Sequence, residues 1–140
     1  MGDWMQRLLY VSESCIYKSD EEATVSKIVS HAQTKNDELS VTGALLFTGQ
    51  HFAQVLEGPT ESVQVLMDWI TNDPRHRIIK VVDTSPITCR QFSDWQMAYQ
   101  GPSQYVSRHV ARLLHTSDPF EQRRAAEWLT ELAREFSRTQ

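Results

Sequence analysis

A glutamine lies between two large apolar residues on one face of a strand that the sequence predicts. The segment is Phe52–Gly58, and period-2 alternation puts Phe52, Gln54 and Leu56 on the same face. We expect the Gln54 amide to be buried, and a buried amide needs hydrogen-bond partners. Its two donors and its carbonyl acceptor can hold two unlike partners at once. A core glutamine bonded only to backbone would give the same pattern, so the rest of the chain has to decide.

Six other side chains carry groups suited to a ligand or to hydrogen bonding, beyond what the apolar pattern requires. A hydroxyl, an amide, a guanidinium and an imidazole are present, with an indole and a thioether on the last predicted strand. Each has an ordinary explanation as a strand tyrosine, a helix C-cap, a charge near a helix end or a core residue. The six are Tyr10, Asn36, Arg75, His76, Trp95 and Met97.

Apolar periodicity predicts the elements that position these side chains. Period-2 runs predict five strands, and stripes at helical spacing predict two helices between them, in the order βαββαββ. Ser19 is expected to cap the first helix, with Glu22 completing a capping box. In the last strand, Trp95, Met97 and Tyr99 are expected on one face. The strands are expected at 7–12, 42–48, 51–57, 78–83 and 95–99, and the helices between residues 19 and 36 and between 59 and 72.

The character of the sequence changes after residues 101–102. Two further amphipathic helices are expected, and both are too short and too apolar on one face to stand alone, so they must pack on the sheet or on another chain. The expected fold is therefore α+β, a ferredoxin-like βαββαββ sheet with two helices on one face, plus two C-terminal helices. We expect a domain at 1–101 and a helical extension at 102–140.

Composition narrows the class of protein. With 140 residues, of which 40% are hydrophobic, the chain fits one domain with a substantial core. The net charge is -4 and the basic residues are scattered, which argues against direct binding of nucleic acid. No apolar run approaches membrane-spanning length and no signal peptide is evident, so we expect a cytoplasmic protein. Cys15 and Cys89 give neither a disulfide framework nor a metal-binding spacing.

The motifs of common enzyme sites are absent from the sequence. It contains no nucleophile elbow, P-loop, dinucleotide-binding glycine fingerprint or HExxH motif. Four glycines, Gly43, Gly49, Gly58 and Gly101, each lie at an expected strand end or turn. We therefore expect no catalytic residues and no metal site.

Taken together and in order, the polar residues resemble the BLUF family of flavin-using blue-light sensors. The resemblance covers roughly residues 7–101. Lys35 stands where another asparagine is often found in the family, and Ala32 replaces a serine seen in some members. Tyr10 is matched through its immediate context, because residues 12–19 align poorly. The matching segments are Lys35-Asn36, Val41–Gly43, Phe52–Gly58, Asp73–His76 and Phe92–Met97.

The resemblance implies a flavin between the two helices, on one face of the sheet. Ile28 and Ile70 match the aliphatic residues that sandwich the ring, and Asn36 matches the asparagine that bonds its pyrimidine edge. Arg75 and His76 match a pair near the ring edge and the phosphate-bearing tail. The implied cofactor is FAD, with FMN or riboflavin as alternatives.

It also implies a photoactive cluster of Tyr10, Gln54, Trp95 and Met97. In the family, the excited flavin takes an electron and then a proton from the tyrosine, and the glutamine amide rotates or tautomerises. Whether Trp95 or Met97 neighbours Gln54 in the dark is left open by the sequence. The signal is expected to pass through the last strand and the C-terminal helices to a separate effector protein.

Two further expectations concern partners and competing functions. The apolar stripe that contains Trp128 and Phe136 suggests a homo-oligomer. One alternative is a light-insensitive, ferredoxin-like ligand-binding module, which would be colourless. Another is a small transferase that uses Arg75 and Asn36 as anion and water binders.

Overall fold

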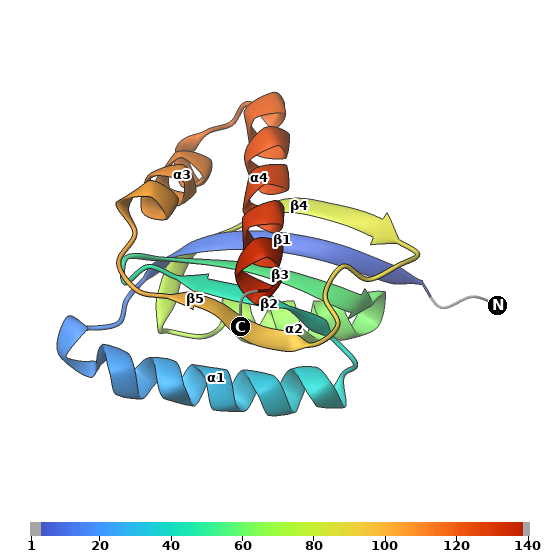
Figure 1. Ribbon diagram of the computed structural model, residues 1–140, viewed down its shortest axis with the longest axis horizontal. Coiled ribbons are helices and arrows are strands. Elements are labelled where there is room, and N and C mark those ends of the chain that lie inside the picture. The colour runs from blue at the N-terminus through green and yellow to red at the C-terminus, as the bar shows by residue number, and fades with distance from the viewer. Residues whose placement is uncertain (1–3, 139–140) are drawn as a thin grey trace.

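The computed structural model of the protein describes residues 4–138, and these form one sheet with helices on both faces (Figure 1). The predicted order βαββαββ followed by two helices is confirmed, and so is the α+β, ferredoxin-like class. A short 3₁₀ turn, η1 (Lys18–Asp20), precedes the first helix. The elements are β1 (Met5–Ser14), α1 (Glu21–Glu38), β2 (Thr42–Phe47), β3 (His51–Pro59), α2 (Thr60–Thr71), β4 (His76–Ile87), β5 (Trp95–Gln100), α3 (Gln104–His115) and α4 (Pro119–Arg138).

The sheet has the strand order β4-β1-β3-β2-β5. β1 pairs antiparallel with β3 and β4, β2 pairs antiparallel with β3, and β5 lies parallel to β2 at the edge. The two central strands place Tyr10 directly opposite Gln54, and Gln54 is in turn opposite Leu45 on β2. The residues with the most distinctive chemistry therefore start from the middle of the sheet.

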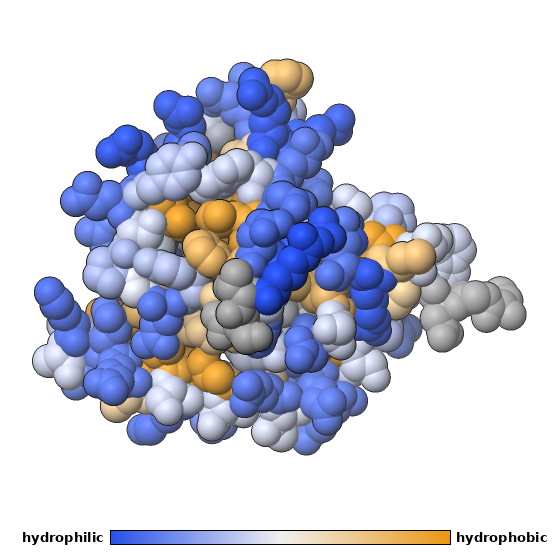
Figure 2. All heavy atoms as spheres, in the orientation of Figure 1, coloured by the Kyte–Doolittle hydropathy of each residue, from blue (hydrophilic) through white to orange (hydrophobic). Residues whose placement is uncertain are grey.

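Two hydrophobic cores share this sheet, one on each face. Alternation along β1 and β3 sends Leu8, Tyr10 and Leu56 to the face covered by α1 and α2. Leu9 and Val55 go to the face covered by α3 and α4. In Figure 2, hydrophobic side chains are visible between α3 and α4, while most of the outward-facing side chains of these helices are hydrophilic. The C-terminal helices thus pack on the sheet face opposite α1 and α2.

Gly43 allows β2 to approach β3 closely at the start of the hairpin. Its φ is +150°, and a Cβ built there would lie 1.9 Å from the carbonyl oxygen of Val55. No other residue fits this backbone conformation and this space without moving β3. The contact fixes the position of β2, against which β5 is laid.

The predicted capping box at Ser19 is wrong. Ser19 lies inside η1, where the N–H of Asp20 already bonds the carbonyl of Tyr17, and α1 begins at Glu21. Asp20 occupies the N-cap position without a side-chain hydrogen bond. The tight 3₁₀ turn replaces the side-chain cap because it bonds backbone groups that the cap would otherwise serve.

The predicted common face of Trp95, Met97 and Tyr99 is also wrong for Tyr99. Leu45 pairs with Met97 and the next residue of β2 pairs with Tyr99, so β5 carries Ala98 as one additional residue at a bulge. Trp95 and Met97 belong to the core beneath α1 and α2, whereas Ala98 and Tyr99 belong to the core beneath α3 and α4. The bulge shifts the alternation by one residue, which is the usual effect of an inserted strand residue.

Strand β4 is longer than the predicted 78–83, since it begins at His76 and runs to Ile87. Within residues 4–138, no helix is both long enough and apolar enough to cross a bilayer.

Candidate functional site

A cavity of about 660 Å³ lies between α1 and α2 over the centre of the sheet. That volume is in the range of pockets for cofactors and small ligands. Eight of the nine site residues predicted from sequence line it, and Met97 does not; Met97 packs at the margin of the neighbouring core. The lining residues are Tyr10, Ile28, His31, Ala32, Lys35, Asn36, Leu45, Phe52, Gln54, Leu66, Trp69, Ile70, Asp73, Pro74, Arg75, His76 and Trp95.

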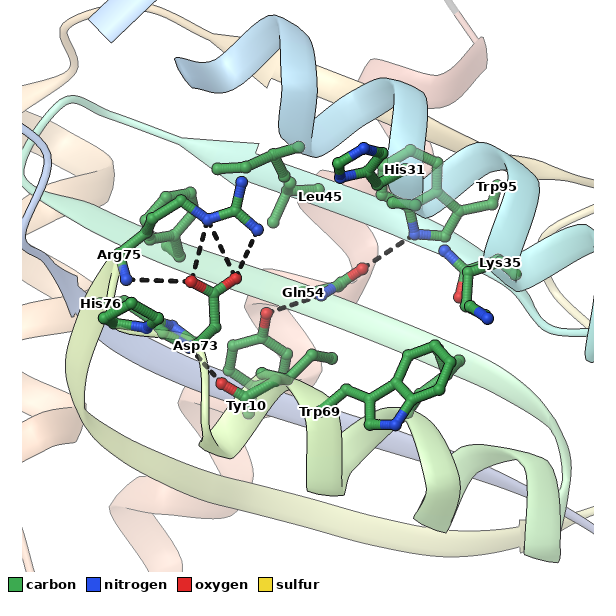
Figure 3. A pocket seen from close by; sticks show the side chains of 17 residues that line it. Tyr10, His31, Lys35, Leu45, Gln54, Trp69, Asp73, Arg75, His76 and Trp95 are labelled. Carbon is green, nitrogen blue, oxygen red and sulfur yellow. Dashed lines mark hydrogen bonds and ion pairs between the residues drawn. The ribbon is translucent and has the colours of Figure 1, made fainter. Parts of the chain in front are cut away.

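Gln54 bridges two aromatic side chains at the floor of this cavity (Figure 3). Its Nε2 donates to the Tyr10 hydroxyl at 2.6 Å, and its Oε1 accepts from the Trp95 indole Nε1 at 2.8 Å. All three side chains are buried. Trp95, rather than Met97, is therefore the neighbour of Gln54 in this arrangement.

The indole of Trp95 fixes which way the Gln54 amide points. An indole N–H can only donate, so it requires the carbonyl end of the amide. If the amide turned by half a revolution, its amino group would face the indole N–H and two donors would be opposed. The Tyr10 hydroxyl, by contrast, can either accept or donate. Trp95 thus selects the orientation, and Tyr10 can adapt to either one.

Tyr10 is held as a neutral phenol. Burial raises the pKa of Tyr10 well above its usual value, the hydrogen bond from Gln54 partly offsets this, and the nearby Asp73 carboxylate raises it further. Because the hydroxyl accepts its bond from Gln54, its own proton stays available to donate. The site therefore presents a buried phenol O–H whose proton does not titrate at neutral pH.

Asn36 lies in the last turn of α1, not at its cap, since the helix continues to Glu38. The side chain is 2% exposed, and its Oδ1 is a buried acceptor without a hydrogen-bond partner among the described residues. Its backbone carbonyl accepts from the N–H of Val41, which ties the end of α1 to the start of the hairpin. A buried orphan acceptor that lines a cavity is suited to a ligand N–H.

Arg75 is fixed by an ion pair at one end of the cavity (Figure 3). Its Nε and terminal nitrogen donate to both carboxylate oxygens of Asp73, at 2.6 to 3.0 Å. Burial alone would raise the pKa of Asp73, but the hydrogen bonds and charge of Arg75 outweigh it and hold that pKa below its usual value. This pairing fixes the plane of the guanidinium where Arg75 lines the cavity.

His76 joins α2 to β1. One ring nitrogen, Nε2, lies 2.6 Å from the carbonyl oxygen of Ile70 and must donate to it, while Nδ1 lies 2.8 Å from the Ser12 hydroxyl. Its ring also meets the rings of Tyr10 and Phe52 edge-on. With both nitrogens engaged, His76 lines the cavity and links α2 to β1. This geometry does not favour a direct role at a phosphate tail.

Lys35 and Trp69 form a contact across the cavity that sequence reasoning missed. The Lys35 ammonium lies 3.9 Å from the centre of the Trp69 ring, a cation–π pair that joins α1 to α2. Figure 3 places both at the end of the cavity opposite Arg75. Trp69 directly precedes Ile70, which was predicted to flank the flavin ring. That position was the available signal that Trp69 also lies near the cavity.

These residues fit an isoalloxazine ring. Ile28 and Ile70 supply apolar walls from opposite helices, as a flat aromatic ligand requires. The unpartnered Oδ1 of Asn36 can accept the imide N–H of such a ring, and Gln54 is set in the floor for its polar edge. Among residues 4–138, no group of three or more His, Cys, Asp or Glu side chains is arranged to hold a metal ion.

Replacing Asn36 with alanine is expected to weaken flavin binding about 5- to 30-fold, the factor for one or two kcal/mol of lost hydrogen bonding. Titration of the apoprotein with FAD, followed by quenching of flavin fluorescence, measures this change. Asn72→Ala is the matched control, because Asn72 is exposed and its amide bonds only the carbonyl of Asp68. Equal affinities in the two variants would contradict the assignment of Asn36.

Comparison with known proteins agrees with this geometry. A family profile described as BLUF, sensors of blue-light using FAD, matches residues 5–98. The photoactivated adenylate cyclase subunit beta of Euglena gracilis is 32% identical over 93 residues, which is 66% of this chain and 11% of that protein. The blue light- and temperature-regulated antirepressor of Escherichia coli (strain K12) is 46% identical over 66 residues, 44% of this chain and 16% of that protein. The chain therefore spans only a small part of these curated relatives.

A solved structure is similar over the whole length. The dark-state structure of BlrB, a BLUF protein, superposes with a TM-score of 0.73 and 31% sequence identity, and the match covers 100% of both chains.

Proposed function

The chain belongs to the BLUF family of blue-light sensors, and we propose that its Gln54 amide is the element that converts light into a change of hydrogen bonding. The matched family is a sensing domain rather than an enzyme. The observation that carries the proposal is the bridge from Tyr10 through Gln54 to Trp95. An accepting hydroxyl, a two-ended amide and a donating indole lie in series on the floor of a cofactor-sized cavity.

We propose FAD as the flavin, held by Asn36 at its pyrimidine edge, by Ile28 and Ile70 on its two faces, and by Arg75 at the cavity edge. The description of the family supports FAD. When bound, the flavin would supply light absorption and an electron acceptor. The protein supplies the geometry and the hydrogen-bond donors around it.

In this proposal Tyr10 is the electron and proton donor. Its phenol O–H is buried and neutral, and it touches the amide whose orientation must change. Its electron and proton would pass to the bound flavin and return afterwards. Without its proton the tyrosine oxygen can only accept, which suits the present orientation of the Gln54 amide; when the proton returns, the hydroxyl can donate to an amide that has rotated or tautomerised.

Rotation of the Gln54 amide has a direct consequence for β5. The turned amide opposes its amino group to the indole N–H of Trp95, so the indole has to shift or give up its partner. Trp95 is the first residue of β5. A change at the amide is thereby passed to the edge strand.

The next residues of β5 contact α4 on the other face. Gln96 donates from Nε2 to the carbonyl of Ser137 at 3.1 Å, and the Tyr99 ring stacks on Phe136 with centroids 4.9 Å apart. We propose that residues 1–101 act as the sensing unit and residues 102–140 as its output extension. The two-state element is the docking of α4 on β5.

Illumination is therefore expected to increase proteolysis within 119–138 relative to the dark protein. Limited digestion of matched dark and illuminated samples, followed by mass spectrometry of the cut sites, measures it. Gln54→Leu provides the control, because its digestion pattern should be the same in light and dark. An identical pattern for the wild-type protein in both conditions would exclude this output.

The remaining parts of the proposal concern partners and location. We propose a cytoplasmic protein that signals to a separate effector, such as a regulator of cyclic-nucleotide turnover or transcription, by analogy with relatives named as cyclases and as an antirepressor. We also propose self-association. Trp128 and Phe136 pack against the protein's own core, so Tyr105 and Phe120, exposed on α3 and α4, are the better candidates for that surface.

The test of the function is the visible spectrum of the purified, flavin-loaded protein before and just after blue light. A flavin spectrum that moves slightly to the red and relaxes back in the dark supports the proposal. A bound flavin that bleaches or does not respond would refute the switching role, and a protein that takes up no flavin would favour the light-insensitive binding module.

A further inference from the structure

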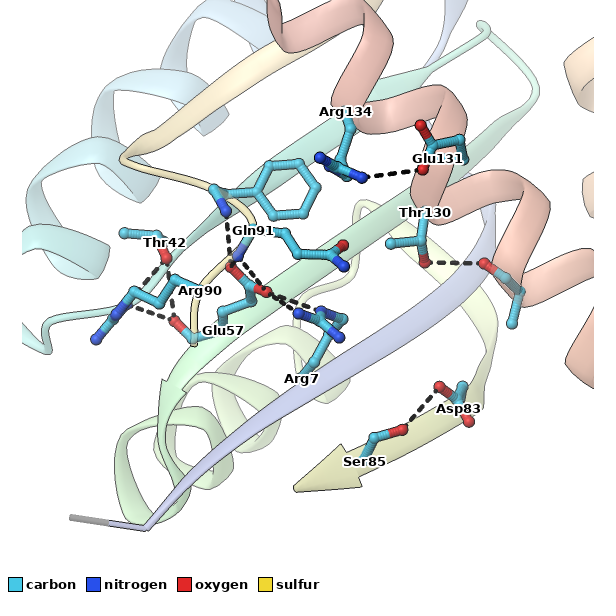
Figure 4. Close-up of polar contacts among 12 residues, drawn as sticks. Arg7, Thr42, Glu57, Asp83, Ser85, Arg90, Gln91, Thr130, Glu131 and Arg134 are labelled. Atoms are coloured by element: carbon cyan, nitrogen blue, oxygen red, sulfur yellow. Dashed lines mark hydrogen bonds and ion pairs between the residues drawn. The ribbon is translucent and has the colours of Figure 1, made fainter. Parts of the chain in front are cut away.

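A fully buried carboxylate lies on the opposite face of β3 from the cavity. Glu57 is 0% exposed and pairs with Arg7, whose Nε and terminal nitrogen each lie 2.7 Å from Oε2. Its oxygens also accept the backbone N–H groups of Gln91 and Phe92, at 2.9 to 3.0 Å (Figure 4). The ion pair with Arg7 uses only part of the hydrogen-bond capacity of the Glu57 carboxylate. The rest is used by the backbone of one loop.

That loop, residues 88–94, connects β4 to β5 and has no helix or strand of its own. Arg90 holds its first half through the carbonyls of Ser40 and Glu57 and the hydroxyl of Thr42, at 2.8 to 2.9 Å. Phe92 is buried in the core beneath α3 and α4. The loop is therefore attached to β2 and β3 by charged side chains rather than by strand pairing.

The loop leads directly into Trp95. The carbonyl of Asp94 accepts from the N–H of Gly43, and the next residue is the indole donor to Gln54. Gln54 and Glu57 are three residues apart on β3, about 10 Å at the rise of a strand, and they face opposite sides of the sheet. β3 thus holds residues 91–95 at two points. The Glu57 carboxylate binds the backbone of Gln91 and Phe92, and the Gln54 amide binds the indole of Trp95.

We propose that Glu57, together with Arg90, is a positioning residue for the light-responsive network. Its carboxylate fixes the loop that aims the Trp95 indole N–H at the Gln54 carbonyl. The inference rests on the proposed function of Gln54 for its consequence in light, but the positioning itself is a property of the dark protein. Glu57 acts through Trp95 and touches neither the cavity nor its ligand.

The first test is Glu57→Gln, which keeps the size of the side chain. The amide oxygen can still accept from one loop N–H, but the new amino group opposes Arg7 or the second N–H, because all of these groups are donors. The readout is the set of four tryptophan indole signals in a proton–nitrogen NMR spectrum of the dark protein. Trp95→Phe identifies the Trp95 signal by its loss. Glu57→Gln is expected to move that signal by more than its linewidth and to leave the other three in place.

A matched control separates positioning from general loss of stability. Ser107→Ala removes a buried hydrogen bond of 2.6 Å to Thr48, at the far end of β2 from the loop. Its Trp95 signal is expected to stay where it is in the wild type. If Glu57→Gln does not fold, Arg90→Gln loosens the same loop from a partly exposed position and is expected to shift the same signal. An unmoved Trp95 signal in the folded variant would overturn the proposal.

The dark-recovery rate connects the positioning to the switch. Glu57→Gln is expected to change the rate about fivefold, the factor for one net hydrogen bond, and in the same direction as Trp95→Phe. The double variant is expected to recover at the rate of Trp95→Phe alone, since both changes act through one contact. Multiplied effects would contradict the proposal. A wild-type protein without any light response would refute the proposed function, and the NMR comparison would still decide the role of Glu57.

Discussion

Replacing Gln54 with leucine is expected to give a yellow protein that no longer shows a reversible red shift. Leucine is close in size but can bond neither the Tyr10 hydroxyl nor the Trp95 indole. The cavity walls and Asn36 are untouched, so flavin binding is expected to persist. The light-minus-dark absorption spectrum measures the loss.

The control is Gln64→Leu, which makes the same chemical change on the exposed face of α2. It is expected to switch like the wild type. The Gln54 variant is also expected to lose about 1–3 kcal/mol of unfolding free energy, because the buried indole N–H loses its acceptor. A normal, reversible shift in Gln54→Leu would show that the amide is not the switch.

Replacing Tyr10 with phenylalanine is expected to remove normal photoswitching as well, for a different reason. The variant keeps the ring and its contacts with His76 but has no proton or accessible electron to supply. The flavin is expected to stay bound and excitable. If proton donation accounts for a factor of about 10², the variant should form less than a hundredth of the shifted state. Transient absorption after a blue flash measures this yield. Tyr17→Phe, at a strongly exposed tyrosine, is the control.

The raised pKa of Tyr10 also makes the stability of the fold depend on pH. Because the folded protein holds the phenol proton more tightly than the unfolded chain, Tyr10 stabilises the fold below its usual pKa of 10.0, and this stability is lost as the pH rises beyond it. Tyr10→Phe is therefore expected to reduce the alkaline loss of unfolding free energy, measured by urea denaturation between pH 8 and pH 11. An unchanged alkaline slope would mean that Tyr10 is not buried as described.

Local sequence patterns were enough to predict most of the fold. The apolar run around Gln54 reflects burial of both faces of β3, and the helical stripes around Ile28 and Ile70 reflect burial of one face of each helix. That signal is repeated along each element. The burial of Gln54 followed from its two apolar neighbours on the same face. Its partners did not follow from the pattern, because Tyr10 and Trp95 come from distant strands.

The errors arose where one residue or one remote contact changes the outcome. A single additional residue in β5 reversed the side of Tyr99, and periodicity over five residues cannot reveal a bulge. The partners of Glu57 lie 34 and 35 positions away in a loop without periodicity, so no local pattern marks it. The pairing of Lys35 with Trp69 likewise depends on how two helices meet.

The bulge at Ala98 bears on any attempt to couple this sensor to a new output. If β5 were regularly pleated through Ala98, Tyr99 would lie on the same face as Trp95 and Met97, beneath α1 and α2, and Phe136 would lose its stacking partner. Removing Ala98 altogether would instead leave Tyr99 paired with Leu46 on its present face. A fusion joined after Gln100 keeps the bulge as it is. A junction placed inside β5 has to be designed so that Tyr99 still pairs with Leu46. The pairing register of β5, and not sequence identity alone, would decide which chimeras transmit a signal.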